Sequence, residues 1–133
     1  MSQENVDLYR EWIERVNRQD IPGALRLMDP EIRVQHRLTV TKSEGDFTGV
    51  DAATDWLADL GRRFASWRID CDDIRDLGDR VLALGTLRAV GKGSGVEAEW
   101  PYTAVASFRD GLVTDYTDYG DRDKALEAAG LSE

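Results

Sequence analysis

The sequence contains only one cysteine, Cys71, so no disulfide can form within the chain. A chain of 133 residues buries enough surface to fold without covalent cross-links, and a domain of this size without disulfides is typical of a reducing compartment. We therefore expect residues 1–133 to form a single cytoplasmic domain in which Cys71 is a small buried side chain.

Basic residues and long apolar segments are also scarce. Lysine and arginine number 17 against 26 aspartate and glutamate residues, which gives a formal net charge of −9. This balance disfavours nucleic acid and anionic membranes, because both attract an excess of positive charge. No apolar stretch approaches the roughly 20 residues of a membrane-spanning helix. The N-terminus has no basic segment followed by an apolar one. We expect neither a nucleic acid partner nor a membrane partner.

Residues typical of metal and nucleophile sites are few. His36 is the only histidine, and with a single cysteine it matches no zinc-binding spacing. The glycine-rich segment 91–95 precedes strand-like residues rather than a helix, which favours a hairpin turn over a phosphate-binding loop. Ser94 within it is not part of a Gly-x-Ser-x-Gly nucleophile motif. We predict no metal and no cofactor.

Apolar residues at intervals of three and four predict three helices in the first half of the chain. These helices are expected over residues 3–18, 21–28 and 51–64. Asp20 and Pro22 are typical of the cap and the first turn of the second helix. A last short helix is expected after Asp121, which can serve as its cap.

Alternation of apolar and polar residues predicts the strands. In the segment from Ile32 to Leu38, the even-numbered residues, including His36, share one face and polar residues occupy the other. Residues 41–50 are polar and glycine-containing, which favours a loop. Four further strands with connections short enough for hairpins are expected over residues 67–76, 80–90, 96–108 and 112–119. Helices followed by hairpin-linked strands indicate an α+β fold, with the helices on one face of an antiparallel sheet.

The register of the last strand decides which acidic residue faces the helices. A turn over residues 109–111 with a glycine bulge puts Tyr116 and Asp118 on the inner face. A two-residue turn reverses the faces and points inward Asp115, Thr117 and Tyr119. We favour the bulged turn, in which Asp118 lies near Tyr102 and Tyr116 near Ala104.

The expected strand over residues 80–90 is apolar on both faces. One face carries Val81, Ala83, Leu87 and Ala89, and the other carries Leu82, Leu84 and Val90. No expected helix is left to cover the second face, and exposed apolar surface of this kind is typical of an interface. We therefore predict a homodimer that packs through the outer face of the sheet.

Four short segments, in this order of helices and strands, resemble a known superfamily. They are Asn17-Arg-Gln-Asp20, Met28-Asp-Pro-Glu-Ile32, Phe47-Thr-Gly49 and Phe108-Arg-Asp-Gly111. The chain resembles the nuclear transport factor 2-like proteins, and it is most similar to the SnoaL-like polyketide cyclase branch, which is related to ketosteroid isomerases. The resemblance covers essentially the whole chain. It implies a cystatin-like cone, in which a curved antiparallel sheet carries three helices from the N-terminal half on its concave face.

The resemblance also implies roles for individual positions. On the isomerase pattern, the general-base aspartate falls on His36, the phenolic donor on Trp12 and the second donor on Ala104, so all three positions are changed. In the SnoaL-like cyclases, a pocket aspartate on the last strand acts as acid or base, and that position falls on or beside Asp118.

His36 and Asp118 are therefore the candidate catalytic residues. An inward imidazole titrates near neutrality and can exchange a proton with a bound substrate. The structural alternatives are a histidine of the pocket wall held by one hydrogen bond and an aspartate at a solvated strand edge. Candidate substrate-binding residues, which alternatively only fill the core, are Tyr9, Trp12, Trp100, Tyr102, Ala104 and Tyr116.

These residues favour a cofactor-independent proton-transfer enzyme of the cyclase, isomerase, lyase or hydrolase type. Its substrate is expected to be a small apolar molecule with a carbonyl group. One alternative is a non-catalytic binding protein for a small hydrophobic ligand. Another is a dimeric interaction module whose cone is filled by its own side chains.

Overall fold

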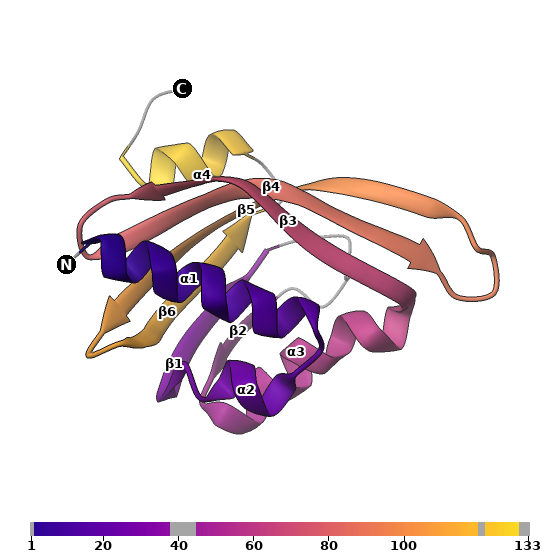
Figure 1. The fold of residues 1–133 in the computed structure, drawn as a ribbon, viewed down its shortest axis with the longest axis horizontal. Coiled ribbons are helices and arrows are strands. Elements are labelled where there is room, and N and C mark those ends of the chain that lie inside the picture. Colours follow the sequence, from indigo (N-terminus) through magenta and orange to yellow (C-terminus); the bar gives the residue numbers. More distant parts are fainter. Residues whose placement is uncertain (1, 38–44, 120–121, 131–133) are drawn as a thin grey trace.

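A curved six-stranded sheet forms the centre of the computed structural model, which describes residues 2–37, 45–119 and 122–130 (Figure 1). Its strands are β1 (Met28–His36), β2 (Gly45–Thr48), β3 (Phe64–Asp76), β4 (Arg80–Gly91), β5 (Glu97–Arg109) and β6 (Leu112–Tyr119). They lie in the order β2-β1-β6-β5-β4-β3. The pair β1 and β6 is parallel, and the other neighbours are antiparallel.

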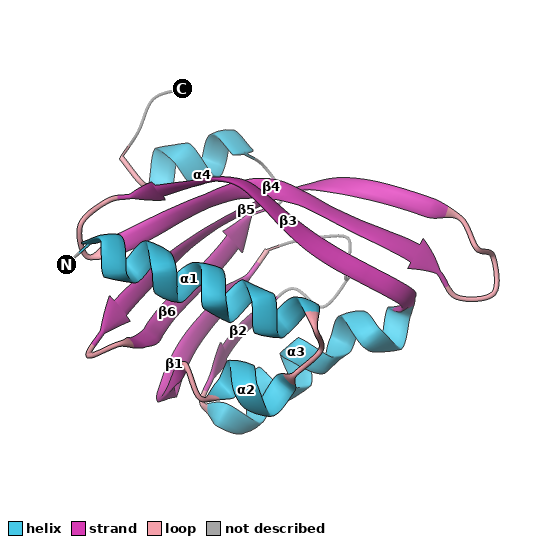
Figure 2. Ribbon diagram, in the orientation of Figure 1, coloured by secondary structure: helices cyan, strands magenta, loops and turns pink. Residues whose placement is uncertain are grey.

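The helices are divided between the two faces of this sheet. They are α1 (Ser2–Asn17), α2 (Ile21–Leu25), α3 (Val50–Arg63) and α4 (Arg122–Ala128). The first three lie on the concave face and α4 lies on the other (Figure 2). The predicted α+β class, with a curved sheet and three helices of the N-terminal half on its concave face, is confirmed.

Irregular pairing accounts for the bend of the long strands. The register of β3 against β4 shifts between Cys71 and Asp73, and a bulge of this kind bends a strand and increases its twist. Gly85 lies opposite Cys71, where a Cβ atom would stand 1.9 Å from the carbonyl oxygen of Asp70. Only glycine allows the two backbones to approach this closely, so Gly85 permits the curvature that encloses the concave face.

The second helix is shorter than the predicted range 21–28. Asp20 caps it as expected, because its Oδ1 accepts the N–H of Gly23 at 3.0 Å. The helix ends at Leu25, and β1 already begins at Met28. The residue before a proline avoids helical backbone angles, so the chain is extended at Asp29, which precedes Pro30.

The predicted loop over residues 41–50 contains a strand. Gly45–Thr48 forms β2 and pairs with the end of β1, with Val34 opposite Phe47. This short strand satisfies backbone groups of β1 that would otherwise lie at the edge of the sheet. Leu38, the last residue of the predicted first strand, and residues 41–44 lie outside the described residues.

The expectation that no helix covers the second face of the strand 80–90 was wrong. Leu82 and Leu84 are buried against Ala125 and Leu126 of α4. Leu82 and Leu84 are therefore not the uncovered apolar surface from which the homodimer was predicted. The homodimer itself stays a prediction. Beyond α4, the outer face carries ion pairs, in which Arg88 binds both Asp70 and Glu99.

The last strand has the predicted inner face but a different turn. Asp110 and Gly111 have φ angles of 53° and 77° and form a two-residue turn, because Arg109 pairs with Leu112. The extra residue comes later, between Val113 and Asp115, and restores the face that the turn alone would reverse. Tyr116 and Asp118 are therefore buried as predicted. The predicted pairing was wrong, since Tyr116 lies opposite Ala106 and Asp118 opposite Ala104.

Candidate functional site

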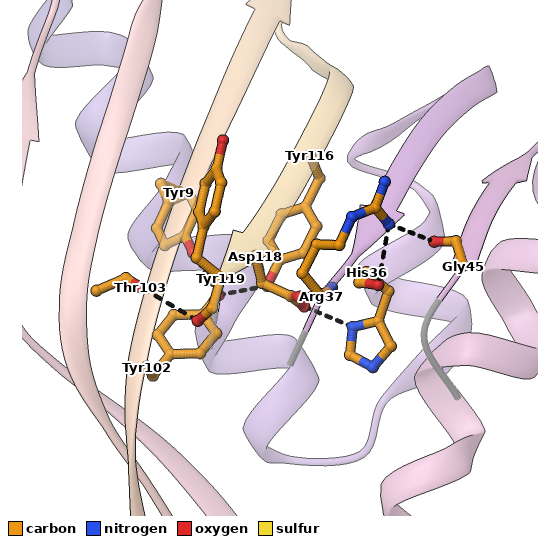
Figure 3. Close-up of polar contacts among 9 residues, drawn as sticks. All are labelled: Tyr9, His36, Arg37, Gly45, Tyr102, Thr103, Tyr116, Asp118 and Tyr119. Carbon is orange, nitrogen blue, oxygen red and sulfur yellow. Dashed lines mark hydrogen bonds and ion pairs between the residues drawn. The ribbon is translucent and has the colours of Figure 1, made fainter. Parts of the chain in front are cut away.

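A buried histidine–aspartate pair lies where β1 and β6 run side by side. His36 and Asp118 are in register on the two parallel strands, and each side chain is about 2% exposed. Nδ1 of His36 lies 2.7 Å from Oδ2 of Asp118, and the backbone N–H of Arg37 donates to Oδ1 of Asp118 at 2.7 Å (Figure 3). Both carboxylate oxygens thus have partners, which fixes the carboxylate and, through it, the imidazole ring.

The side chain of Arg37 ties this region to β2. Its Nη1 donates to the carbonyl oxygens of His36 at 3.2 Å and Gly45 at 3.3 Å, and its Nη2 lies 2.8 Å from Asp46. Figure 3 shows the two contacts of Nη1 beside the imidazole. The end of β1 is therefore held on both sides, by β6 and by β2, so the position of His36 is set by the sheet rather than by a loop.

The pair lines a narrow cavity between the concave face of the sheet and the helices. The volume of this cavity is about 40 Å³, enough for only a few water molecules. The polar residues of the wall are His36, Asp59 and Asp118. The aliphatic ones are Ile13, Val16, Leu57 and Ile69. The aromatic ones are Trp12, Trp56, Trp67, Tyr102 and Tyr116. An apolar wall with few polar groups is typical of a small-molecule site.

An aromatic ring lies against the imidazole and continues into a cluster of further rings. The ring of Trp56 lies edge-on to His36, with 6.1 Å between ring centroids, and 4.9 Å from the ring of Tyr116. The ring of Trp12 in turn lies 5.2 Å from that of Tyr116. A planar apolar ligand that enters this cavity therefore meets aromatic surfaces on several sides.

Three buried tyrosines form a continuous chain of hydroxyl groups behind the cavity. The hydroxyl oxygens of Tyr9 and Tyr102 are 2.7 Å apart, and those of Tyr102 and Tyr116 are also 2.7 Å apart. Burial raises the pKa of each of the three phenols well above its ordinary value, and the charge of Asp118 adds to the effect at Tyr116. These phenols therefore stay protonated at neutral pH and act as hydrogen-bond donors.

This chain predicts that the protein loses stability in alkaline solution. A phenol whose pKa is higher in the folded than in the unfolded state stabilises the fold fully below the unfolded pKa, near 10, and that stabilisation is lost as pH rises toward the folded value. With three such phenols, the free energy of unfolding should fall by about 4 kcal/mol per pH unit above roughly pH 10. Urea unfolding followed by circular dichroism between pH 9 and 11 measures this slope.

Absorbance at 295 nm, which reports tyrosinate, provides the check on this prediction. It should rise together with the loss of near-ultraviolet circular dichroism, since the three phenols ionise on unfolding. Tyr119 is only half-buried, so a Tyr119→Phe control should keep most of the slope. Ionisation of all the tyrosines in a protein that keeps its near-ultraviolet spectrum would contradict the raised pKa values.

Two buried hydrogen-bond donors in the wall have no partner. Among the described residues, the buried side-chain nitrogen and oxygen atoms without a hydrogen bond are Nε1 of Trp12 and Nε1 of Trp67. Both indole rings line the cavity. Because an unpaired buried donor is unfavourable, an acceptor that reaches either N–H gains a hydrogen bond that the described part of the protein does not provide.

The structure brings most of the predicted site residues to this cavity. His36, Asp118, Trp12, Tyr102 and Tyr116 line it. The remaining three predicted residues lie elsewhere. Tyr9 lies behind Tyr102, and Ala104 is a buried residue of β5 opposite Asp118. Trp100 lies outside the cavity wall and packs against Phe64, with ring centroids 5.7 Å apart.

Trp56 and Trp67 line the cavity but were absent from the sequence-based set. The helical spacing of α3 placed Trp56 on an apolar face, which indicates core packing and a cavity wall equally well. Trp67 lies at the expected start of a strand, where its orientation depends on the curl of the sheet. The alternation of side chains along β3, which places Trp67 on the inner face, was the one signal in the sequence that could have identified this residue.

Other reactive groups do not add to the site. Cys71 is half-buried rather than buried as predicted, and burial raises the pKa of its thiol to about 12, so little thiolate exists at neutral pH. Within the part of the chain that the structure describes, histidine, cysteine and acidic side chains form no group of three that could hold a metal ion. The same residues include no helix long and apolar enough to span a membrane.

Known families and structures were compared with the chain. A family model for the SnoaL-like domain matches residues 9–116. A search of the curated proteins found no match.

Solved structures resemble the chain over nearly its whole length. A nuclear transport factor 2-like protein of unknown function from Burkholderia pseudomallei is 25% identical, with a TM-score of 0.78 and coverage of 93% of this chain and 95% of that one. TerC, crystallised with polyporic acid, is 22% identical, with a TM-score of 0.78 and coverage of 96% and 98%. A candidate polyketide cyclase from Xanthomonas campestris pv. campestris is 22% identical, with a TM-score of 0.72 and coverage of 96% and 98%.

Proposed function

The chain belongs to the SnoaL-like domain family, and from that premise we propose that it is a cofactor-independent proton-transfer enzyme for a small, largely apolar molecule with a carbonyl group. The observation that carries the proposal is the buried His36–Asp118 pair in the wall of an aromatic cavity. The likeness to TerC, which was crystallised with polyporic acid, and to a candidate polyketide cyclase supports a small organic ligand.

The first step is removal of a proton from carbon. Oδ2 of Asp118 accepts the Nδ1–H of His36, so the lone pair of the ring lies on Nε2. Nε2 takes a proton from the carbon next to the bound carbonyl group. The electron pair of that C–H bond forms a C=C bond, and the carbonyl π electrons move to oxygen to give an enolate. The imidazolium that results is stabilised by the carboxylate of Asp118, 2.7 Å away.

Hydrogen-bond donors stabilise the negative charge that develops on the enolate oxygen. The unpaired N–H of Trp12 and the hydroxyl group of Tyr116 are the donors we assign to this task. Because burial raises the pKa of Tyr116, its phenol keeps the proton that it donates. Donors in a cavity that excludes water bind an enolate more strongly than a neutral ketone, which lowers the barrier to proton removal.

The fate of the proton defines the reaction type. His36 returns it to a different carbon in an isomerisation. In a cyclisation, the enolate carbon attacks a second carbonyl group of the same molecule, and the proton goes to the alkoxide that forms. In a lyase reaction the enolate expels a group from the neighbouring carbon, and the proton goes to that group. In a hydrolase reaction, Nε2 instead takes its proton from an attacking water molecule.

Exchange of carbon-bound protons in D₂O tests the proposal without knowledge of the substrate. A panel of small ketones with protons next to the carbonyl group, including cyclohexanone and 1-tetralone, is first screened for compounds that raise the melting temperature. Proton NMR then follows the signals next to the carbonyl group. We expect compounds that bind to lose these signals at a rate proportional to protein concentration.

Binding without exchange would instead favour the second candidate, a non-catalytic carrier or sensor of a small hydrophobic ligand. The predominantly apolar wall of the cavity is the observation that favours this alternative. An interaction module with a filled cone is the third candidate, and the small volume of the cavity, about 40 Å³, is the observation that favours it.

A further inference from the structure

The two unpaired indole N–H groups come from distant parts of the fold. Trp12 lies on α1 and Trp67 on β3. Strand β3 forms one edge of the sheet, and β6, β5 and β4 separate it from β1, which carries His36. Trp67 and His36 nevertheless line one cavity, because the sheet curls around it (Figure 1). The two donors therefore belong to one site.

The burial of these two groups calls for an acceptor. Trp12 is 1% exposed and Trp67 is 8% exposed, and both nitrogen atoms are shielded from solvent. Native structures contain few unpaired buried donors, because each has lost its hydrogen bonds to water without replacement. An indole nitrogen can only donate, so an acceptor alone can satisfy it. Two such donors on residues that line one apolar cavity thus indicate that its ligand carries hydrogen-bond acceptors.

The space around Trp67 also continues beyond the cavity. Val16, Leu57 and Trp67 line a neighbouring hollow as well, whose other walls come mainly from α2 and α3. Trp67 therefore lies at the junction of the two spaces. An acceptor group that reaches its N–H can belong to the middle of a longer molecule as well as to its end.

We propose that the ligand of this cavity carries two hydrogen-bond acceptors on an apolar frame, one bound by the N–H of Trp12 and one by the N–H of Trp67. A molecule with two carbonyl groups is the simplest substrate class that fits. The inference rests on the proposed function only in taking the cavity as a small-molecule site, since it concerns binding and not the proton-transfer step.

The two donors have different tasks in this arrangement. Trp12 is in contact with Tyr116 and receives the carbonyl group that becomes an enolate. Trp67 receives the second acceptor, whose charge does not change during proton transfer. A contact that is equally strong in the ground state and the transition state affects KM and not kcat. Trp67→Phe should therefore raise KM for a dicarbonyl substrate and leave kcat unchanged, as a positioning residue would.

Indole NMR signals measure the two contacts directly. Protein labelled with ¹⁵N gives one side-chain signal for each of its 4 tryptophans, assigned by single Trp→Phe variants. The probes are two matched pairs, cyclohexanone with 1,4-cyclohexanedione and anthrone with anthraquinone. We expect the monoketones to move the Trp12 signal downfield and the diketones to move the signals of both Trp12 and Trp67. Trp100 packs against Phe64 outside the cavity, so its signal should stay in place.

Affinity provides the second readout. Trp67→Phe keeps an aromatic ring but removes the N–H, so it should weaken diketone binding by about three- to tenfold, the value of one hydrogen bond, and leave monoketone binding unchanged. Trp100→Phe is the matched control and should change neither.

Several results would overturn the inference. A Trp67 signal that stays in place while the diketones move the Trp12 signal would show that one acceptor suffices. Equal weakening of both members of a probe pair by Trp67→Phe would show that the indole only packs. In either case the proposed function stands if ketone exchange still depends on His36. If no probe moves either signal and none exchanges its protons, both proposals fail.

Discussion

Replacing His36 by glutamine is expected to reduce protein-dependent exchange of ketone protons by about 10²–10⁴-fold, the usual contribution of a positioned general base. Glutamine is close to histidine in size, and its amide N–H can still donate to Oδ2 of Asp118, which otherwise would lose its partner. It has no group that accepts a proton near neutral pH. The variant therefore removes the base while it preserves the hydrogen bond and the cavity wall. Proton NMR in D₂O, under conditions of saturating ketone, measures the rate.

Binding and stability distinguish a catalytic from a structural role in this variant. The ketone should still bind His36→Gln with a dissociation constant within about threefold of the wild-type value, because the aromatic wall supplies most of the contact area. Gln35 precedes His36 on β1 but faces the outer side, where the hydroxyl group of Thr117 donates to it at 3.0 Å. Gln35→Ala is therefore the control and should exchange ketone protons like the wild type. Undiminished exchange by His36→Gln would remove His36 from the mechanism.

The helices and most strands could be predicted because their patterns are local. The spacing of Tyr9, Ile13 and Val16 defines one face of α1, and all three are buried. The errors came from partners distant in sequence. Gly45–Thr48 is a strand only because the end of β1 lies beside it. Likewise, Leu82 and Leu84 are covered by a helix some 40 residues later, and no local pattern indicates where that helix packs.

The candidate site was predictable in part for the same reason. The alternation of side chains along each strand predicted that His36 and Asp118 face inward. It does not predict that the two side chains are in contact. Their contact follows from the parallel pairing of β1 with β6, which joins strands more than 70 residues apart in the sequence. The sequence of a single strand also cannot place a bulge, so the predicted pairing of Tyr116 was wrong while its predicted face was right. Trp67 depends on the curl of the whole sheet, and its role in the wall was missed.

The contact between the two catalytic candidates changes the role of Asp118. Sequence reasoning treated both residues as partners in proton exchange with the substrate. Oδ2 of Asp118 instead contacts His36, and Oδ1 accepts the backbone N–H of Arg37. A carboxylate held in this way orients the imidazole and stabilises its protonated form, so we propose that Asp118 is a positioning residue and that, of these two residues, only His36 contacts the substrate.

Replacing Asp118 by asparagine should therefore abolish activity through the tautomer of His36. The backbone N–H of Arg37 can only donate, so the amide oxygen of the new side chain must face it. The NH₂ group then faces Nδ1 of His36, which has to accept, and the ring proton moves to Nε2. A protonated Nε2 cannot remove a proton from the substrate. We expect ketone exchange to fall by about 10²–10⁴-fold, as in a serine-protease triad, where the same substitution costs roughly 10⁴-fold.

The tautomer itself is measurable, because His36 is the only histidine in the sequence. Long-range ¹H–¹⁵N NMR should show the Nδ1–H form in the wild type and the Nε2–H form in Asp118→Asn, with the fold retained in both. Asp115→Asn is the matched control, since Asp115 lies on the same strand and forms an exposed ion pair with Arg33 at 2.8 Å. It should change neither the tautomer nor the exchange rate. An Asp118→Asn protein that keeps the Nδ1–H form and full activity would show that the carboxylate neither orients nor charges the imidazole, and the proton-transfer role of the pair would then be lost.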